Sequence, residues 1–341
     1  MQNQPDSRTK SNADFAGGYG KRFLRQNFPA LYDALVRLRR ARPVRLVEGA
    51  GNRLAAKRIV ESGKSFDVDV CERNGFGASL SGVVTMHHFF RDAPGLRKVV
   101  VSNPLYLSRV GGDVLDQYFE RKSVKTSGAI DAVIPFRNDY DLSTERPDQG
   151  LSIRGAGEIF RQNYTIKQEF LDQAAKFFSH NLSKPVGVHF RGSDKRFEAE
   201  LVSWDRIRRS VDACMDEFGS NSIFVATDEP AFLSFMLERY GSQRVRSLDC
   251  EFQAAGNLPA HFLSGDGFKK GQEALLTILL LSMCEVCVRG ASHLSAWAKI
   301  LNPDLPIVML GKPFQHVYGF PDKEIFEEFM QGPLTHLAGP R

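Results

Sequence analysis

The sequence predicts an α/β protein with two doubly wound domains that face each other across a cleft. Apolar runs of strand length alternate with segments of helical periodicity in both halves of the chain, and this alternation is typical of parallel sheets covered by helices. The length of 341 residues also exceeds what one hydrophobic core usually supports. We therefore place an N-terminal domain at 1–160, a C-terminal domain at 161–321 and a terminal helix at 322–341, for which packing on the first domain is one option.

The first half begins with helical patterning at 29–40 and 53–61 and then becomes α/β. A strand at 66–71, the turn Gly75-Phe76-Gly77, a helix at 80–90 and a strand at 98–101 form one βαβ unit. Helix or loop is expected at 121–133, an irregular crossing at 135–150 and the linker between the domains at 150–162.

The second half repeats the alternation of helices and strands. Because each strand is followed by a helix, the strands are expected to be parallel and their carboxyl ends to form one ligand-binding edge. Helices are expected at 166–178, 204–218, 231–240, 272–282, 293–301 and 322–330, and strands at 186–190, 222–226, 245–248, 286–288 and 307–309.

The composition excludes several classes of protein. Hydrophobic residues at 42% and charged residues at 25% are ordinary for a soluble globular protein, and no apolar run is long enough to cross a bilayer. Residues 1–12 are polar and lack the apolar segment of a secretory signal, so a cytoplasmic location is expected. Five cysteines do not form a disulfide framework, and a net charge of +5 is too small to indicate nucleic-acid binding.

A basic cluster follows the first helical segment. It contains Arg37, Arg39, Arg40, Arg42 and Arg45. One interpretation is a solvated helix face. The other is peripheral contact with anionic lipid at the inner face of the membrane, or capture of an anionic acceptor.

The most informative segment is the strand at 186–190 and the polar loop that follows it. His189, Arg191, Asp194 and Lys195 lie in or directly after this apolar run, where an open α/β sheet binds its ligands. Arginine offers a rigid fork of donors to phosphate oxygens, lysine a mobile positive charge, and aspartate a carboxylate that holds either in place. The segment therefore predicts a site for a phosphorylated ligand.

Two further strand ends carry compatible side chains. Thr227 and Asp228 follow the strand at 222–226, and the loop Arg289-Gly290-Ala291-Ser292-His293-Leu294-Ser295 leads into a helix whose free N–H groups favour an anion. Any one of these loops has an ordinary structural explanation, such as a helix cap. Together they predict one site that binds a diphosphate.

The motifs resemble the three-motif signature of the α-1,6-/protein O-fucosyltransferase superfamily. The matching segments are Gly187 to Lys195, Ala226 to Pro230 and Leu280 to Val288, and the turn Gly75-Phe76-Gly77 is similar to the glycine motif of the bacterial nodulation-type members. The resemblance covers about 66–303. It implies a GT-B-like fold of two Rossmann-type domains and inverting transfer of fucose from GDP-fucose, with no metal or other cofactor.

The resemblance also assigns roles to residues. Arg191 would bind the β-phosphate and stabilise the departing GDP, His189 would contact the nucleoside, and Asp194 and Lys195 would complete the catalytic site. Asp228 would lie in the second donor loop and Ser292 near the phosphates. The remaining candidate donor-binding residues are Gly75, Gly77, Thr227, His293 and Ser295.

The sequence departs from the superfamily at two positions. The glutamate proposed as general base in eukaryotic α-1,6 members falls here on Ala199, so the base is Glu198 or Glu200, and we select Glu198. The carboxylate that reads guanine falls on Thr277, and Glu273, one helical turn away, is a possible substitute.

Two other functions are compatible with the sequence. A metal-dependent glycosyltransferase would use Asp67 and Asp69, or Asp139 and Asp141, as a D-x-D ligand pair. A non-catalytic protein could bind a sugar nucleotide in the same cleft. The acceptor, which the first-domain loops at 103–112 and 135–150 would bind, remains open among an oligosaccharide, a glycolipid and a peptide.

Overall fold

The computed structural model describes residues 58–71, 74–107, 112–122, 130–136, 148–192, 200, 202–254, 259–312 and 319–339. All of them belong to one compact unit, Arg58–Arg341. The helical segment at 29–40, the basic cluster of five arginines, the pair Asp139 and Asp141, and the candidates Asp194, Lys195 and Glu198 lie outside the described residues. The domain boundary at 160 stays a prediction.

The first sheet has three parallel strands in the order β2-β1-β4. Its central strand β1 (Phe66–Val70) is buried, with Phe66 and Val68 fully inaccessible and Val70 nearly so. Helix α4 (Phe76–Phe89) connects β1 to β2 (Leu96–Val101), which confirms the predicted βαβ unit. Strand β4 (Ala132–Phe136) replaces the helix, loop and crossing expected there.

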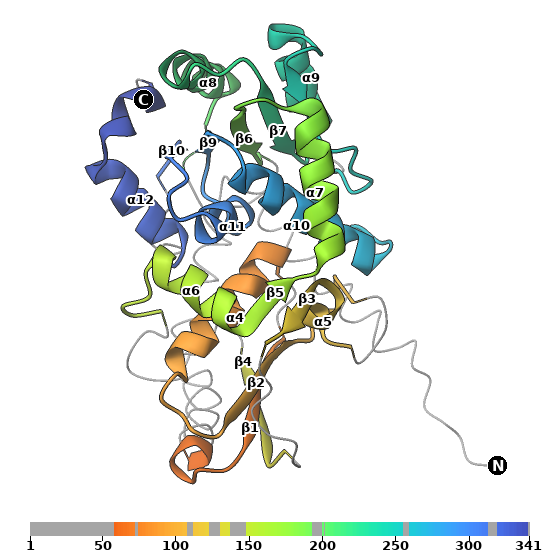
Figure 1. Ribbon diagram of the computed structural model, residues 1–341, viewed down its shortest axis with the longest axis vertical. Coiled ribbons are helices and arrows are strands. Elements are labelled where there is room, and N and C mark those ends of the chain that lie inside the picture. Colours follow the sequence, from red (N-terminus) through yellow and green to blue (C-terminus); the bar gives the residue numbers. More distant parts are fainter. Residues whose placement is uncertain are drawn as a thin grey trace, which may run out of the picture. The chain divides into compact units, whose positions relative to one another are not determined.

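The second sheet has five parallel strands in the order β10-β9-β6-β7-β8. Figure 1 labels β10, β9, β6 and β7. Read from β8, the strands follow one another as third, second, first, fourth and fifth in the chain, which is the strand order of a Rossmann sheet. The order reverses between β6 and β9, so the ligand crevice is expected beyond the carboxyl ends of these two strands. The strands are β6 (Val186–Phe190), β7 (Ile223–Thr227), β8 (Val245–Arg246), β9 (Val286–Arg289) and β10 (Ile307–Met309).

Helices connect these strands as the sequence predicts. The amphipathic helix α8 (Trp204–Phe218) starts at Ser203, whose hydroxyl accepts a hydrogen bond from Arg206 N, and ends at Gly219 with a left-handed backbone. The apolar stretch 278–281 of α10 (Gly267–Ser282) lies in the protein core. The other helices of this half are α7 (Gln168–Asn181), α9 (Pro230–Tyr240) and α11 (His293–Leu301).

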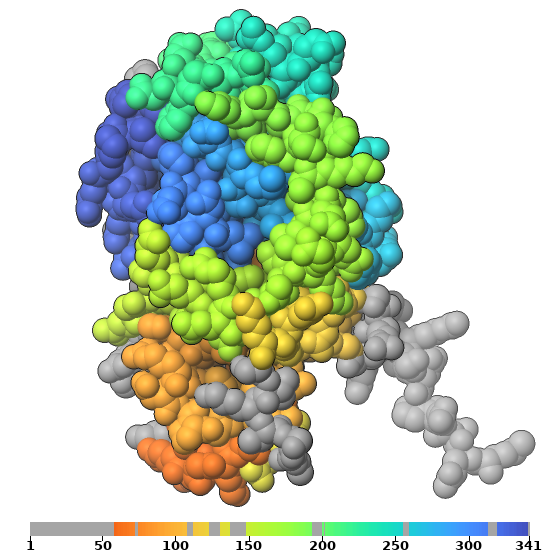
Figure 2. Space-filling model, in the orientation of Figure 1, coloured from red at the N-terminus to blue at the C-terminus, as the bar shows by residue number. Residues whose placement is uncertain are grey.

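The linker expected at 150–162 is instead helix α6 (Ile153–Asn163). Its two glycines are unfavourable in a helix, so the sequence did not indicate one. Ile153, Ala156 and Phe160 nevertheless have helical spacing and form one buried face. Gly157 permits a close approach to α11, since a Cβ there would lie 2.5 Å from the Ile300 carbonyl oxygen. Figure 2 shows the yellow-green residues of this region directly against the blue residues of the C-terminal part.

A short antiparallel pair was also not expected from the sequence. Strand β3 (Phe119–Arg121), which follows helix α5 (Val114–Tyr118), pairs with β5 (Tyr164–Ile166). Three-residue strands carry too few side chains to show a period of two.

The terminal helix α12 (Asp322–Gln331) packs on elements of the second half. It contacts β10, α11 and the 3₁₀ segment η3 (Pro333–Ala338) that follows it. The Ala338 carbonyl accepts a hydrogen bond from Arg206 Nε at 3.2 Å, which ties the end of the chain to α8. Within the described ranges, no helix is both long and apolar enough to cross a membrane.

His87, on α4, contacts a polar network that contains Tyr164 and Arg121. Its Nε2 lies 3.0 Å from the Tyr164 hydroxyl, to which Arg121 donates from 3.3 Å. Burial, and secondarily the charge of Arg121, lowers the pKa of His87 from 6.5 to about 4.

This shift predicts a loss of stability in mild acid. Between about pH 6.5 and pH 4 the unfolded chain binds a proton at His87 and the folded chain does not, so the free energy of unfolding decreases as the pH falls. The contribution reaches about 3 kcal/mol below this window. Urea unfolding of the wild type and H87Q across this range should show a shallower pH dependence for H87Q. Equal slopes would contradict the prediction, and H336Q, at an exposed position, is the control.

Candidate functional site

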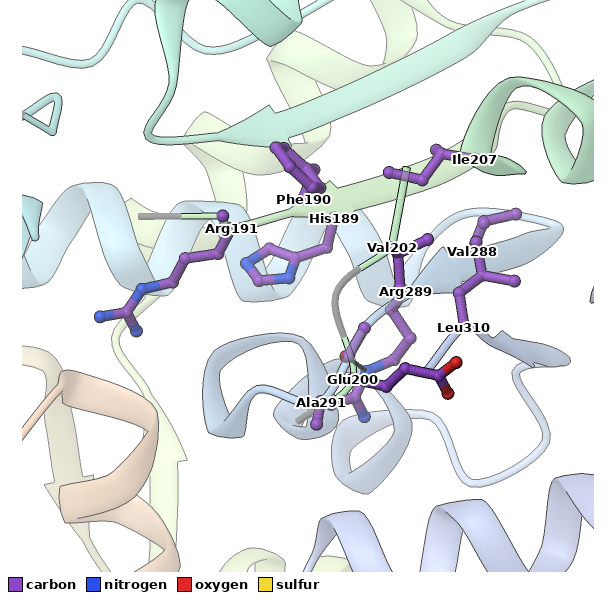
Figure 3. Close-up of a pocket in the computed structure, with 12 residues that line it drawn as sticks. His189, Phe190, Arg191, Glu200, Val202, Ile207, Val288, Arg289, Ala291 and Leu310 are labelled. Atoms are coloured by element: carbon purple, nitrogen blue, oxygen red, sulfur yellow. Dashed lines mark hydrogen bonds between the residues drawn. The ribbon is translucent and has the colours of Figure 1, made fainter. Parts of the chain in front are cut away.

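A pocket lies at the carboxyl ends of β6 and β9, where the strand order reverses (Figure 3). This is the position at which an open α/β sheet binds its ligand. We call it the switch-point pocket. Its lining residues are His189, Phe190, Arg191, Gly192, Glu200, Val202, Ile207, Val288, Arg289, Gly290, Ala291 and Leu310.

Strand alternation directs the side chains of His189, in β6, and Arg191, directly after it, toward the same side. His189 and Arg191 project together, whereas Phe190 projects from the opposite face (Figure 3). Phe190 packs against Phe232, with their ring centroids 4.4 Å apart, which fixes the strand end on its apolar side. His189 is buried next to Arg191, with an exposed fraction of 7%.

The Arg191 guanidinium is held from two directions. Its Nε lies 3.8 Å from Asp228 Oδ2, and its Nη2 lies 3.3 Å from His261 Nδ1. The side chain is 19% exposed, so the positive charge is shielded from bulk water without being sealed from a ligand. The structure therefore brings together Arg191, His189 and Asp228, as the sequence predicts.

The loop after β7 supports the Arg191 loop through Glu229. Its Oε1 accepts a hydrogen bond from Gly192 N at 2.8 Å, while its own N–H donates to the Thr227 hydroxyl at 3.1 Å. A Cβ at Gly192 would lie 2.6 Å from that Oε1, so a larger residue here would displace the Glu229 carboxylate. Thr227 thus has a local structural contact, and Glu229 is a site residue that the sequence analysis did not select.

Arg289 supports the loop after β9 from inside the protein. Its side chain is fully buried, pairs with Asp322, and donates to the carbonyls of Ser292 at 2.7 Å and Gly290 at 3.0 Å. Its Nη1 has no hydrogen-bond partner in the part of the chain that the structure describes. An unsatisfied buried donor in the wall of a pocket is a candidate contact for a ligand oxygen.

Two of the three predicted residues around α11 are buried. Ser295 is fully buried, with its hydroxyl 3.4 Å from the Ser292 carbonyl, and Ser292 is 2% exposed. His293 points to α4, where its Nδ1 lies 3.1 Å from Ser81 Oγ. Ser292 and Ser295 lie buried at the start of α11, and the contact of all three residues with a donor stays a prediction.

The two glycines of the first-half turn have different surroundings. A Cβ at Gly77 would lie 2.7 Å from backbone atoms of His293 and Leu294, so this glycine permits α4 and α11 to pack closely. Gly75 lies just before α4 with open space around it. The next residue, Phe76, donates its N–H to the Tyr106 hydroxyl at 2.8 Å.

Tyr106 links this turn to Arg191. Its ring is 2% exposed, and burial raises the pKa of its hydroxyl, while the nearby charge of Arg191 partly offsets that rise. The start of α4 therefore lies within the electrostatic range of the Arg191 guanidinium.

Glu200 is the one candidate base within the described residues. Its Oε2 accepts from Lys312 N at 3.3 Å, and its carboxylate points away from His189 and Arg191 (Figure 3). The structure therefore gives no support to Glu200. Asp194, Lys195 and Glu198 fall between Gly192 and Glu200, outside the described residues, and stay predictions.

Two other sets of carboxylates have internal partners. Asp67 is 3% exposed with its Oδ1 3.5 Å from Arg97 Nε, and Asp69 accepts from the N–H and hydroxyl of Ser102 at 3.2 and 2.8 Å.

Glu273 accepts hydrogen bonds from the N–H groups of residues 251 and 252. Burial raises the pKa of Glu273 despite these bonds. Among the described residues, no group of three or more His, Cys, Asp or Glu side chains is arranged to bind a metal.

His261 also belongs to the site and was missed by the sequence analysis. It lies in the 3₁₀ segment η2 (Ala260–Phe262), between β8 and α10. No strand ends there, so the rule that places ligands at strand ends does not identify it. Only the spatial contact with Arg191 reveals its role.

The comparisons with known proteins support the fold. No protein-family model matches the chain, and no curated protein is significantly similar in sequence. The crystal structure of fucosyltransferase NodZ from Bradyrhizobium matches with a TM-score of 0.50 and 14% identity, over 72% of this chain and 95% of that one. A NodZ alpha-1,6-fucosyltransferase soaked with GDP-fucose gives 0.49 and 16% over the same shares, and POFUT1 in complex with GDP gives 0.42 and 14%, over 72% and 98%. The predicted GT-B-like class and the resemblance to fucosyltransferases are confirmed at the level of the fold.

Proposed function

We propose that this chain is an inverting glycosyltransferase that transfers fucose from GDP-fucose to a glycan or glycoconjugate acceptor without a metal ion. One observation carries the proposal. Arg191 lies at the switch point of a Rossmann-type sheet, largely shielded from water, with its guanidinium fixed by Asp228 and His261. The structural similarity to the fucosyltransferase NodZ from Bradyrhizobium supports fucose as the transferred sugar.

Arg191 would act on the leaving group. When the bond between the sugar C1 and the β-phosphate oxygen breaks, negative charge accumulates on the departing diphosphate. A guanidinium that is already in position stabilises this charge with little reorganisation. Lys195 would supply a second positive charge and Asp194 would hold it in place.

Inversion needs a base on the opposite face of the sugar. The acceptor hydroxyl would attack C1 from that side while a carboxylate removes its proton. Glu198 is our candidate, because it lies three positions after Lys195 in the sequence. The donor phosphates would lie between the loops after β6 and β9, with His189 toward the nucleoside.

Metal independence is supported by the charges at the site and by the contacts of the alternative ligands. Arg191 lies in the pocket wall, where the charge of the leaving group would develop. Asp67 is largely buried beside Arg97, and Asp69 accepts a hydrogen bond from Ser102. Both carboxylates of this D-x-D pair therefore already have partners within the protein. The pair Asp139 and Asp141 lies outside the described residues.

The test begins with the donor. Calorimetric titration should show binding of GDP and GDP-fucose to the full chain, and stronger binding than UDP or UDP-sugars. Mass spectrometry with a panel of oligosaccharide, glycolipid and peptide acceptors should then detect a product heavier by one deoxyhexose. NMR of that product should show inversion at C1, and activity should persist in EDTA.

Each arm can contradict part of the proposal. Binding of GDP-fucose without product or donor hydrolysis would indicate a sugar-nucleotide receptor instead. Loss of activity in EDTA that Mg²⁺ or Mn²⁺ restores would favour the metal-dependent alternative. Absence of GDP binding would overturn the proposed function.

A further inference from the structure

His261 contacts a group that can only donate hydrogen bonds. The ring nitrogen assigned as Nδ1 lies 3.3 Å from Arg191 Nη2. A guanidinium has no acceptor, so this ring nitrogen must carry a lone pair and no proton. A hydrogen bond at this contact therefore requires a neutral imidazole with its proton on the other ring nitrogen.

Lys270 holds the segment that presents His261. The lysine lies in the first turn of α10, and its Nζ donates to the Leu263 carbonyl at 2.6 Å and to the His261 carbonyl at 3.4 Å. Its ammonium also lies 5.0 Å from the centroid of the Phe252 ring. Lys270 is 6% exposed, and burial lowers its pKa.

The loop after β7 is tied to the same region. Ala254 N donates to the Asp228 carbonyl at 2.7 Å, so the segment that contains Phe252 is anchored beside Asp228. The Asp228 carboxylate faces Arg191 Nε from 3.8 Å, and His261 faces the far end of the guanidinium. The carboxylate attracts the positive charge of Arg191, whereas a neutral imidazole orients the guanidinium without neutralising it.

We propose that His261 is a positioning residue for Arg191, active as the neutral tautomer protonated on Nε2, and that Lys270 keeps it in place. Among the described residues, charged groups that face the imidazole and its segment include Arg191, Asp228 beyond it, and Lys270. Protonation of His261 would remove the acceptor and place a second cation against Arg191. Donor binding therefore weakens in mild acid.

The effect on donor binding rests on the proposed function, but the tautomer does not. Long-range ¹H–¹⁵N spectra of the full chain, labelled at histidine nitrogens, report the tautomer directly, and H261F assigns the signal. We expect a neutral ring with the proton on the nitrogen that faces away from Arg191. A proton on the nitrogen that faces Arg191, or a ring already charged at neutral pH, would overturn the inference even if GDP binds.

GDP titrations test the consequence. Asparagine at this position offers an oxygen near the place of Nδ1 but does not titrate, whereas phenylalanine keeps a ring without an acceptor. At about pH 7.5 we expect H261F to bind GDP about three- to tenfold more weakly than the wild type, and H261N to retain most of the affinity. As the pH falls below neutrality, the ratio of wild-type to H261F affinity should approach one, while the ratio of H261N to H261F affinity stays unchanged.

Controls separate this role from general effects. H180N alters an exposed histidine on α7 and should bind GDP with the pH dependence of the wild type. K270M should weaken GDP binding and broaden the His261 signal. Wild-type affinity and pH dependence in H261F, or an unchanged His261 signal and affinity in K270M, would overturn the respective assignment. A wild type that shows the expected tautomer but binds no GDP would refute the proposed function and leave the positioning contact established.

Discussion

Replacing Arg191 with alanine is expected to lower kcat/KM for GDP-fucose by about 10²- to 10³-fold. The guanidinium is fixed before the reaction by Asp228 and His261, so it is in place when charge develops on the leaving diphosphate. An interaction that strengthens in the transition state contributes to kcat as well as to binding. Donor hydrolysis and transfer assays on the purified variant measure both effects.

Two further variants show whether geometry or charge matters. R191K keeps a positive charge but loses the planar fork that Asp228 and His261 hold, so it should recover only part of the loss. R154A removes an exposed arginine, 62% accessible and paired with Asp304, and should have wild-type kinetics. Equal kinetics of R191A and R154A would contradict the assignment of Arg191.

The second large effect is on stability. Replacing Asp322 with alanine is expected to reduce the free energy of unfolding by about 3–5 kcal/mol, because it leaves the Arg289 charge buried without its partner. The Arg289 side chain is fully inaccessible and Asp322 is 13% exposed. The same guanidinium holds the carbonyls of Gly290 and Ser292, so the loop after β9 should loosen as well.

Urea unfolding followed by circular dichroism measures this loss. D304A is the matched control, because it also removes an aspartate from an arginine, but that pair is 62% and 82% exposed. A surface pair of this kind contributes at most about 1 kcal/mol. A D322A loss no larger than that of D304A would show that the Arg289 pair is not a structural anchor.

Much of the second sheet could be predicted because its strands are buried on both sides. Runs such as Val186–Val188 and Ile223–Ala226 are apolar throughout and lead directly into the polar residues His189 and Thr227. Since the strands are parallel, those polar residues meet at one edge. Arg191 and Asp228 were therefore placed together correctly from the sequence.

Contacts between distant segments could not be predicted in this way. His261 lies 70 residues after Arg191, in a short 3₁₀ segment with no motif, and only folding brings the two together. Gly77 matched a glycine motif in the sequence, but the structure shows a packing role that depends on the position of α11. Helix α6 was missed because glycine lowers helical propensity, while its packing on α11 supplies the stabilisation that propensity lacks.

A crystal structure of the full chain with GDP is the most direct test of the central claim. We predict that the β-phosphate lies within hydrogen-bond distance of the Arg191 guanidinium, between the loops after β6 and β9. GDP bound at another edge, for example beyond the ends of β1 and β4, with Arg191 distant from both phosphates, would contradict it.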